Sequence, residues 1–269
     1  MRVIVTRPER EARAWVEALV ERGLDALALP LIDIRPVSDP ADMLAVWHRL
    51  GDYAALMFVS GIAVEHFFAV KTLVHRSSDA GGRKTRFWGP GPGTAAALRR
   101  HGVDASLIDA PPPDRGQFDS EALWDLVQTQ VQAGDRISIV RGSDDAQDQA
   151  ATQGAATAGY GRDWLARRLL QAGALVEFVL AYRRAVPVLS TAQSTTLQDA
   201  ANDGSIWLFT SALAVANLRA CSPRQSWADA SAIATHPRIA DAARAAGFGV
   251  VWESRPGVSE VVASIESIR

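Results

Sequence analysis

Short apolar runs alternate with stretches of helical periodicity along almost the whole chain. The first run, Val3–Val5, predicts a buried parallel strand, and residues 9–22 carry apolar side chains at helical spacing before Gly23. The apolar run 27–32 predicts the second strand of a right-handed βαβ unit. The alternation continues with predicted strands at 54–59, 87–88, 136–140, 175–184, 205–210, 230–234 and 248–252, and predicted helices at 41–49, 60–70, 94–101, 120–132, 161–173, 190–201, 211–220, 237–246 and 258–268. This order of elements is typical of α/β proteins with parallel sheets.

One strand–turn–helix design occurs twice. Residues 58–67 (FVSGIAVEHF) recur at 209–218 (FTSALAVANL), an offset of 151 positions, and residues 91–98 recur at 236–243, an offset of 145. Two copies of one design predict two similar, doubly wound α/β domains. Clefts between domains are common binding sites for small molecules, so the repeat also predicts a ligand site between the two domains.

A third, weaker sequence match indicates how the domains are built. Ile4–Arg7, followed by a helix that bears a tryptophan, is matched by Ile139–Gly142. The elements of the second half complete a sheet only if the first βαβ unit joins them. The sequence therefore predicts a discontinuous first domain (1–35 plus 187–269), an inserted second domain (39–180), and linker strands near 31–37 and 179–186.

Composition excludes several classes of protein. The chain is 48% hydrophobic and 22% charged, as soluble globular proteins are, and its net charge of −2 implies no general attraction to nucleic acid. Cys221 is the only cysteine, which excludes an intramolecular disulfide and a thiolate metal cluster. Without a run of 18 apolar residues or a signal-peptide pattern, we expect a cytoplasmic protein that does not span a membrane.

Two further features bear on ligands. Nearly all the basic side chains are arginines, because Lys71 and Lys84 are the only lysines, and the planar guanidinium suits carboxylates and phosphates. Residues 144–160 are rich in Ala, Gln, Gly, Asp and Thr and offer little to bury, so they predict a mobile insertion. The glycines at 89, 91 and 93 do not continue into a dinucleotide-binding fingerprint, because Thr94 and Ala95 follow.

The candidate ligand-binding residues come from junctions where a strand passes into a helix. Free backbone N–H groups and the positive end of the helix attract anions there, and in doubly wound sheets these junctions lie at the carboxyl ends of the strands. The candidates are Arg7, Ser60, Gly61, Gly91, Gly93, Thr94, Arg141, Gly142, Thr210, Ser211, His236 and Arg238. The two serines and Thr94 equally suit ordinary helix caps, and each arginine equally suits a solvated surface.

Read in order, the motifs of the chain resemble those of uroporphyrinogen-III synthases. The matching segments are Val5–Pro8, Phe58–Val64, Gly89–Ala95, Gly161–Leu165, Val179–Arg184, Phe209–Ser211, His236–Ala240 and Ala246–Phe248. Each motif is weak alone, but the ordered set covers nearly the whole chain. Two positions depart from the pattern, since Val59 and Ile239 stand where the family has threonine.

The resemblance implies a cyclising hydro-lyase that closes hydroxymethylbilane to uroporphyrinogen III, with loss of water and inversion of ring D. It implies two doubly wound domains joined by a two-stranded linker, an active site in the interdomain cleft, a monomer, no partner besides the small-molecule substrate, and no metal or organic cofactor. It also implies that Tyr182 lies in the linker strand facing the cleft, where its phenol acts as a general acid or positions the departing hydroxyl.

Two alternatives stay open at this point. Tyr182 also suits a purely structural role in the linker. A two-domain protein that binds an anionic small molecule without catalysis would have a similar topology, because fold alone does not settle function. His236 suits either anion binding or a structural role, and the other histidines, at positions 48, 66, 75 and 101, are expected on helix faces or in loops without partners.

Overall fold

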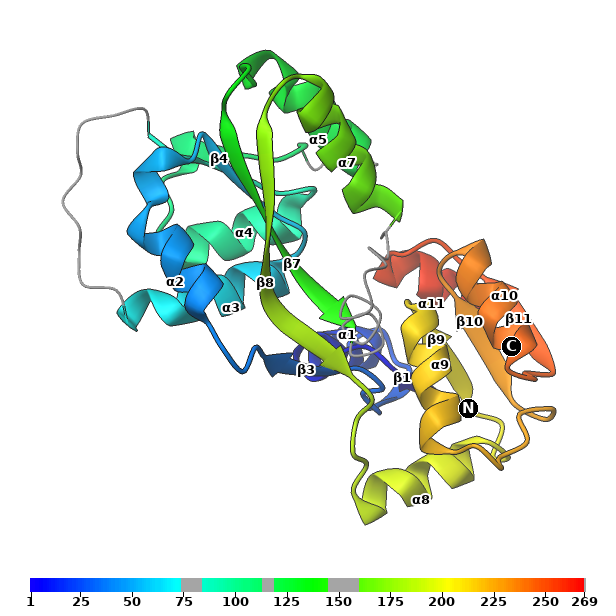
Figure 1. Cartoon of the computed structure of the whole chain (residues 1–269). Coiled ribbons are helices and arrows are strands. Elements are labelled where there is room, and N and C mark those ends of the chain that lie inside the picture. The colour runs from blue at the N-terminus through cyan, green and yellow to red at the C-terminus, as the bar shows by residue number, and fades with distance from the viewer. Residues whose placement is uncertain (74–83, 113–118, 145–159, 269) are drawn as a thin grey trace. The chain divides into compact units, whose positions relative to one another are not determined.

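The computed structural model describes residues 1–73, 84–112, 119–144 and 160–268 (Figure 1). The chain divides into two compact units: unit 1 comprises Met1–Ile34 and Ala185–Arg269, and unit 2 comprises Arg35–Arg184. The insertion predicted at 144–160 falls almost wholly on 145–159, which lie outside the described residues.

Unit 1 contains a five-stranded parallel sheet. Its strands, in spatial order, are β11 (Val250–Glu253), β10 (Ser231–Ala234), β9 (Ile206–Phe209), β1 (Arg2–Val5) and β2 (Asp25–Ala28). All four neighbouring pairs are parallel. Strand β1 lies inside the sheet because it pairs with β2 on one edge and with β9 on the other.

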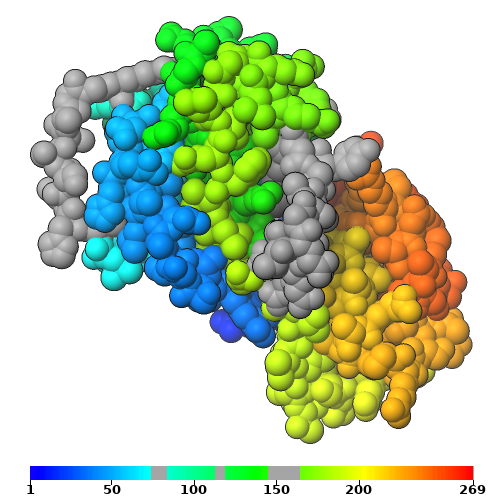
Figure 2. Space-filling model, in the orientation of Figure 1, coloured from blue at the N-terminus to red at the C-terminus, as the bar shows by residue number. Residues whose placement is uncertain are grey.

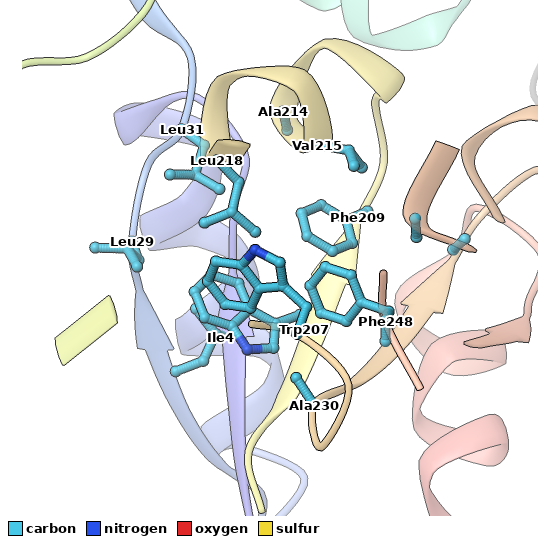
Figure 3. Packing of buried hydrophobic residues seen from close by; sticks show 14 of the residues in the cluster. Ile4, Leu29, Leu31, Trp207, Phe209, Ala214, Val215, Leu218, Ala230 and Phe248 are labelled. Carbon is cyan, nitrogen blue, oxygen red and sulfur yellow. The ribbon is translucent and has the colours of Figure 1, made fainter. Parts of the chain in front are cut away.

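Helices cover both faces of this sheet because side chains along each strand alternate between two cores. Trp207 and Phe209 of β9 pack with buried residues of α8 (Thr191–Ala200), α9 (Ala212–Cys221) and α10 (Pro237–Ala245). Ile206 and Leu208 pack on the other face with α1 (Glu9–Val20) and α11 (Val258–Ile268). Figure 3 shows the first core, where the Phe209 and Phe248 rings lie 5.4 Å apart at 84°.

Unit 2 contains a six-stranded sheet. In spatial order its strands are β3 (Asp33–Pro36), β8 (Leu175–Ala185), β7 (Arg136–Asp144), β4 (Ala55–Phe58), β5 (Arg86–Trp88) and β6 (Ile108–Asp109). The pairs from β8 to β6 are all parallel. The two points where the chain passes between the units fall within β3 and at the end of β8.

Helices also cover both faces of the second sheet. Met57 and Ile139 pack with α5 (Ser120–Val127) and α7 (Tyr160–Gln171). On the other face Phe58 packs against Phe67 of α3 (Gly61–Ala69), whose ring also stacks on Trp47 of α2 (Ala41–His48). The remaining elements are α4 (Pro92–Arg100) and the short 3₁₀ turns η1 (Leu50–Asp52), η2 (Val70–Leu73), η3 (Ala105–Leu107) and η5 (Gln128–Gln130).

The two sheets repeat one spatial order, which explains the sequence repeat. The series β2, β1, β9, β10, β11 in unit 1 corresponds to β8, β7, β4, β5, β6 in unit 2. In the repeat, β4–α3 therefore corresponds to β9–α9, and α4 corresponds to α10. The weaker sequence match is between β1 and β7. The predicted fold class, α/β with two doubly wound parallel sheets, is confirmed.

Two predicted strand boundaries are wrong. The strand expected at 27–32 is β2, at Asp25–Ala28. The apolar run continues past it because Leu29 and Leu31 are buried in the core, and their N–H groups donate to the carbonyl oxygens of Val5 and Thr6. The strand expected to end at Val140 instead continues as β7 to Asp144, since β8 extends beside it as a partner. Arg141 and Gly142 are therefore paired with β8 at a register shift, and do not form a junction with a helix.

Helix α9 anchors both chain passages on the unit 1 side. The Asn217 amide donates hydrogen bonds to the carbonyl oxygens of Leu31 (2.8 Å) and Ala185 (3.4 Å). One turn later the Cys221 thiol donates to the Pro187 carbonyl at 3.6 Å, and burial raises the pKa of that thiol. Cys221 is therefore a protonated packing residue. Within the described part of the chain, none of the helices is long and apolar enough to cross a bilayer.

Candidate functional site

In each sheet the strand order reverses at one pair of neighbouring strands. From one strand of the pair the chain continues towards one edge of the sheet, and from the other strand it continues towards the opposite edge, so we call this pair the reversal point. In unit 2 this pair is β4 and β7, and in unit 1 it is β9 and β1. Doubly wound sheets bind ligands beyond the carboxyl ends of the strands at such a point. Some candidates follow these strand ends, as Ser60 follows β4 and Ser211 follows β9, and the candidates of α4 and α10 follow the adjacent strands β5 and β10. Each unit is therefore described around its own reversal point.

Tyr182 is the centre of the candidate site in unit 2. It lies on β8, its side chain is almost fully buried, and its hydroxyl is 3.4 Å from the Ser60 hydroxyl, which follows β4. Gly142 of β7 lies against the phenol ring, because a Cβ atom added there would be 2.4 Å from Tyr182 Cζ. Three strands thus bring Tyr182, Ser60 and Gly142 into one cluster.

The start of α3 supports this cluster. Ser60 is the N-cap, and its hydroxyl oxygen accepts a hydrogen bond from the Ala63 N–H at 3.2 Å. A Cβ at Gly61 would lie 3.6 Å from Ala97 Cβ and 3.7 Å from the Gly93 carbonyl oxygen, so the starts of α3 and α4 are neighbours. The predicted helix-cap role of Ser60 is confirmed, and its contact with a ligand stays a prediction.

At the start of α4 the candidates divide by exposure. Gly91 is the N-cap and is buried, whereas Gly93 is exposed. Thr94 is buried, and its methyl group packs on the chain at Gly89, where a Cβ would be only 2.8 Å away. Gly89 therefore has to be a glycine for Thr94 to fit, which is a structural reason for one glycine of this motif.

Arg141 is the basic candidate of unit 2. Its guanidinium carbon lies 4.6 Å from the centre of the Phe178 ring, a cation–π contact between β7 and β8. Phe178 is 42% exposed, and the yellow-green surface of this part of the chain is visible in Figure 2. Farther along the same strands Arg184 Nε pairs with Asp144 Oδ1 at 2.7 Å.

In unit 1 Arg7 lies just before α1 and is held by side chains of that helix. Its Nε and Nη2 donate to Glu11 Oε2 at 2.9 and 2.6 Å, and its guanidinium lies over the Trp15 ring. A substrate carboxylate at this position would therefore compete with Glu11. This pairing was not predicted, although the i,i+4 spacing of Arg7 and Glu11 is a signal for it.

The other unit 1 candidates flank helix starts. Thr210 and Ser211 follow β9, and the Ser211 hydroxyl accepts from the Leu213 N–H at 3.2 Å as the N-cap of α9. The imidazole of His236 caps α10, because its Nδ1 accepts from the Arg238 N–H at 3.1 Å. This bond leaves the other ring nitrogen, Nε2, as the donor in neutral His236.

Two histidines expected to lack partners have them. The ring of His66, on α3, stacks on Tyr182 with centroids 5.6 Å apart and planes at 27°. His101 stacks on Phe68 and its Nε2 lies 2.9 Å from Glu65 Oε2. Burial lowers the pKa of His66, although the nearby Glu65 carboxylate opposes this effect. His66 is the site residue that sequence reasoning missed, and its place on the helix capped by Ser60 was the available signal.

Comparisons with known proteins point to one family. The model of the family described as uroporphyrinogen-III synthase HemD matches residues 13–263. A uroporphyrinogen-III synthase from Chlorobaculum parvum is 34% identical over 105 residues, which are 38% of this chain. That alignment spans only 39% of the relative's own length.

Two solved structures share the fold over the whole chain. A mutant uroporphyrinogen III synthase from Thermus thermophilus has a TM-score of 0.53 and 17% identity, with 100% of this chain and 98% of that chain covered. Uroporphyrinogen-III synthetase from Helicobacter pylori has a TM-score of 0.57 and 15% identity, with both chains covered completely. At these identities the likeness concerns the fold.

Proposed function

Because the chain belongs to the uroporphyrinogen-III synthase family, we propose that it is a cyclising hydro-lyase that converts hydroxymethylbilane into uroporphyrinogen III. The family match over residues 13–263 is the observation that carries this proposal. The substrate is a flexible linear tetrapyrrole with eight carboxylates. The product is its ring, closed with the last pyrrole, ring D, inverted.

The proposed reaction draws its electrons from the pyrroles. Loss of the terminal hydroxyl as water leaves an electrophilic azafulvene, which the substituted carbon of ring D attacks to give a spiro intermediate. Fragmentation of this intermediate and a second closure invert ring D. The protein then has to hold the two ends of the chain together in one geometry, and this positioning accounts for most of the rate.

Tyr182 is the proposed catalytic residue. Its phenol O–H donates a hydrogen bond to the departing hydroxyl, as a general acid or as a positioning group. Three observations support this role: the hydroxyl lies at the reversal point of the unit 2 sheet, it is 3.4 Å from Ser60 Oγ, and Gly142 leaves room for the ring. The side chain is also almost fully buried, which favours a defined orientation.

The substrate carboxylates are proposed to bind at helix starts and arginines at the carboxyl ends of the strands, at and next to the two reversal points. Free N–H groups at the N-termini of α3, α4, α9 and α10 suit carboxylates, as do the guanidiniums of Arg7, Arg141 and Arg238. Ser60, Gly61, Gly91, Gly93, Thr94, Gly142, Thr210, Ser211 and His236 complete the proposed set. The interdomain cleft, the monomeric state and the cytoplasmic location stay predictions of the sequence.

The test is the isomer of the product. Hydroxymethylbilane generated in the assay closes spontaneously to isomer I, so the purified protein is added, the product is oxidised, and the porphyrin isomers are separated. The proposal expects isomer III well above the spontaneous background. Isomer I alone, with retention of the bilane by the protein, would instead support a binding protein without catalysis.

A further inference from the structure

We propose that His66 is a positioning residue for Tyr182, and that its ring holds the phenol in the orientation that the reaction uses. This inference rests on the proposed catalytic role of Tyr182. The observation behind it is the stack of the two rings, with centroids 5.6 Å apart and planes inclined by 27°.

The helix that carries His66 contacts Tyr182 at two places. Ser60, the N-cap of α3, lies beside the phenol oxygen, and His66, on the same helix, lies beside the ring. A single rigid element therefore sets both the plane of the ring and the neighbour of its hydroxyl. Side chains held by packing on rigid elements keep a reactive geometry better than side chains on loops.

Gly142 supplies the space for this arrangement. An added Cβ there would meet three ring atoms of Tyr182, at 2.4, 2.5 and 2.8 Å. The ring thus lies against the bare backbone of β7 and also packs on a flat imidazole. Loss of the imidazole would leave the ring free to tilt, and the hydroxyl would then move away from Ser60.

The geometry favours packing over proton transfer. A relay would need an imidazole nitrogen to approach the phenol oxygen nearly in the plane of its ring, at about 3 Å. The observed contact is between ring faces. Burial also lowers the pKa of His66, which favours its neutral form, and a neutral ring stacks on Tyr182 without adding a charge beside the phenol.

The kinetic experiment compares His66→Ala, His66→Phe and Tyr182→Phe, alone and combined. We expect His66→Ala to lower kcat by about three- to tenfold with KM within about twofold, and His66→Phe, which keeps a flat ring, to stay within about twofold of wild type. On the Tyr182→Phe background, His66→Ala should lower kcat by less than about twofold, because both changes act through one phenol.

His101→Ala is the matched control. His101 is also a partly buried histidine of unit 2 that stacks on an aromatic ring, that of Phe68, with centroids 4.9 Å apart and planes at 26°. Its removal should leave kcat unchanged. The proposal fails if His66→Ala lowers kcat no more than His101→Ala does, or if His66→Phe lowers kcat as much as His66→Ala. It also fails if the kcat losses of His66→Ala and Tyr182→Phe multiply in the double variant. Should His66→Ala not fold, His66→Leu fills the site without a flat ring and replaces it.

A second measurement does not depend on activity. The chain has three tyrosines, so the ring signals of ¹³C-labelled tyrosine are few, and those of Tyr182 are identified by their loss in Tyr182→Phe. His66→Ala should shift the Tyr182 signals, and His101→Ala should not. Unshifted signals overturn the positioning role even in an active enzyme. A protein that forms only isomer I refutes the proposed function instead, while the signals still report whether His66 orients Tyr182.

Discussion

The side-chain amide of Asn217 donates a 2.8 Å hydrogen bond to the backbone carbonyl of Leu31, and the same nitrogen lies 3.4 Å from the carbonyl oxygen of Ala185. These carbonyls belong to the two chain passages next to the unit boundary. Asn217 is 151 positions after His66 in the repeat. The same position of the repeated helix thus contacts the linker region in both units.

Asn217→Ala should lower the free energy of unfolding by about 1–3 kcal/mol, because two carbonyl groups lose a donor in a buried place. Urea unfolding measures the change. Asn202→Ala is the matched control, since the Asn202 amide also donates to a carbonyl, that of Gln198, but at an exposed position. Equal urea midpoints for the two variants would show that the Asn217 hydrogen bonds stabilise the protein no more than the exposed Asn202 bond does.

Tyr182→Phe should lower kcat by about ten- to a hundredfold while the protein folds normally, because only the phenol oxygen is removed. The formation of isomer III is measured under steady-state conditions, with circular dichroism to confirm folding. The loss is not expected to be total, since positioning of the substrate remains. A variant within about twofold of wild type would remove Tyr182 from the chemistry.

Gly142→Ala should displace the same ring while the hydroxyl group stays present. The added Cβ would be 2.4 Å from Tyr182 Cζ, so the ring has to move, and we expect a loss of about 1–3 kcal/mol in stability together with a fall in kcat of about tenfold. Gly51→Ala is the control, because a Cβ there meets nothing within 4 Å. Normal kinetics of Gly142→Ala would contradict the close packing.

Arg7→Ala should raise KM by about tenfold and change kcat less, if its guanidinium binds a substrate carboxylate in place of Glu11. Arg13→Ala, on α1, is a close control, because Arg13 also pairs with a glutamate four residues away, at 2.7 Å from Glu9, and is exposed. Steady-state titration with the bilane separates the two constants. An unchanged KM would exclude Arg7 from the substrate site.

Tyr53 should couple stability to alkaline pH. Burial, the hydrogen bond that its hydroxyl donates to Glu177, and the charge of that carboxylate raise the pKa of Tyr53 from 10.0 to about 12. Because the folded pKa is the higher one, the contribution is complete below pH 10 and is lost as pH rises through about 12. Urea midpoints across this range should fall less steeply for Tyr53→Phe than for wild type, and equal slopes would contradict the shift.

Local sequence signals predicted the elements well where one helix or strand determines them. The helix after Ser190 has a complete capping box, in which the Ser190 hydroxyl and the Gln193 side chain each bond to the other's backbone. The repeated serines, Ser60 and Ser211, are both N-caps as the pattern allowed. These interactions involve residues within one turn, so periodicity and residue type reveal them.

Interactions between distant segments were not predictable in the same way. The extension of β7 to Asp144 depends on its pairing with β8. Strand β8 begins about thirty residues later in the chain, a separation typical of a βαβ unit. The stack of His66 on Tyr182 joins residues of two different elements, and a single sequence contains no signal for the angle between them. The pairing of Arg7 with Glu11, by contrast, is local, and its i,i+4 spacing was a sequence signal for it.

The inner place of β1 in its sheet has a consequence for biosynthesis. Thr6, just after β1, hydrogen-bonds the Leu208 carbonyl of β9, 202 residues later. At the pace of translation a ribosome needs roughly 10 to 40 s to deliver that partner. Meanwhile unit 2, which is continuous, has been made in full. One edge of β1 is paired early, by β2, but its other edge stays without a partner strand until β9 has been synthesised.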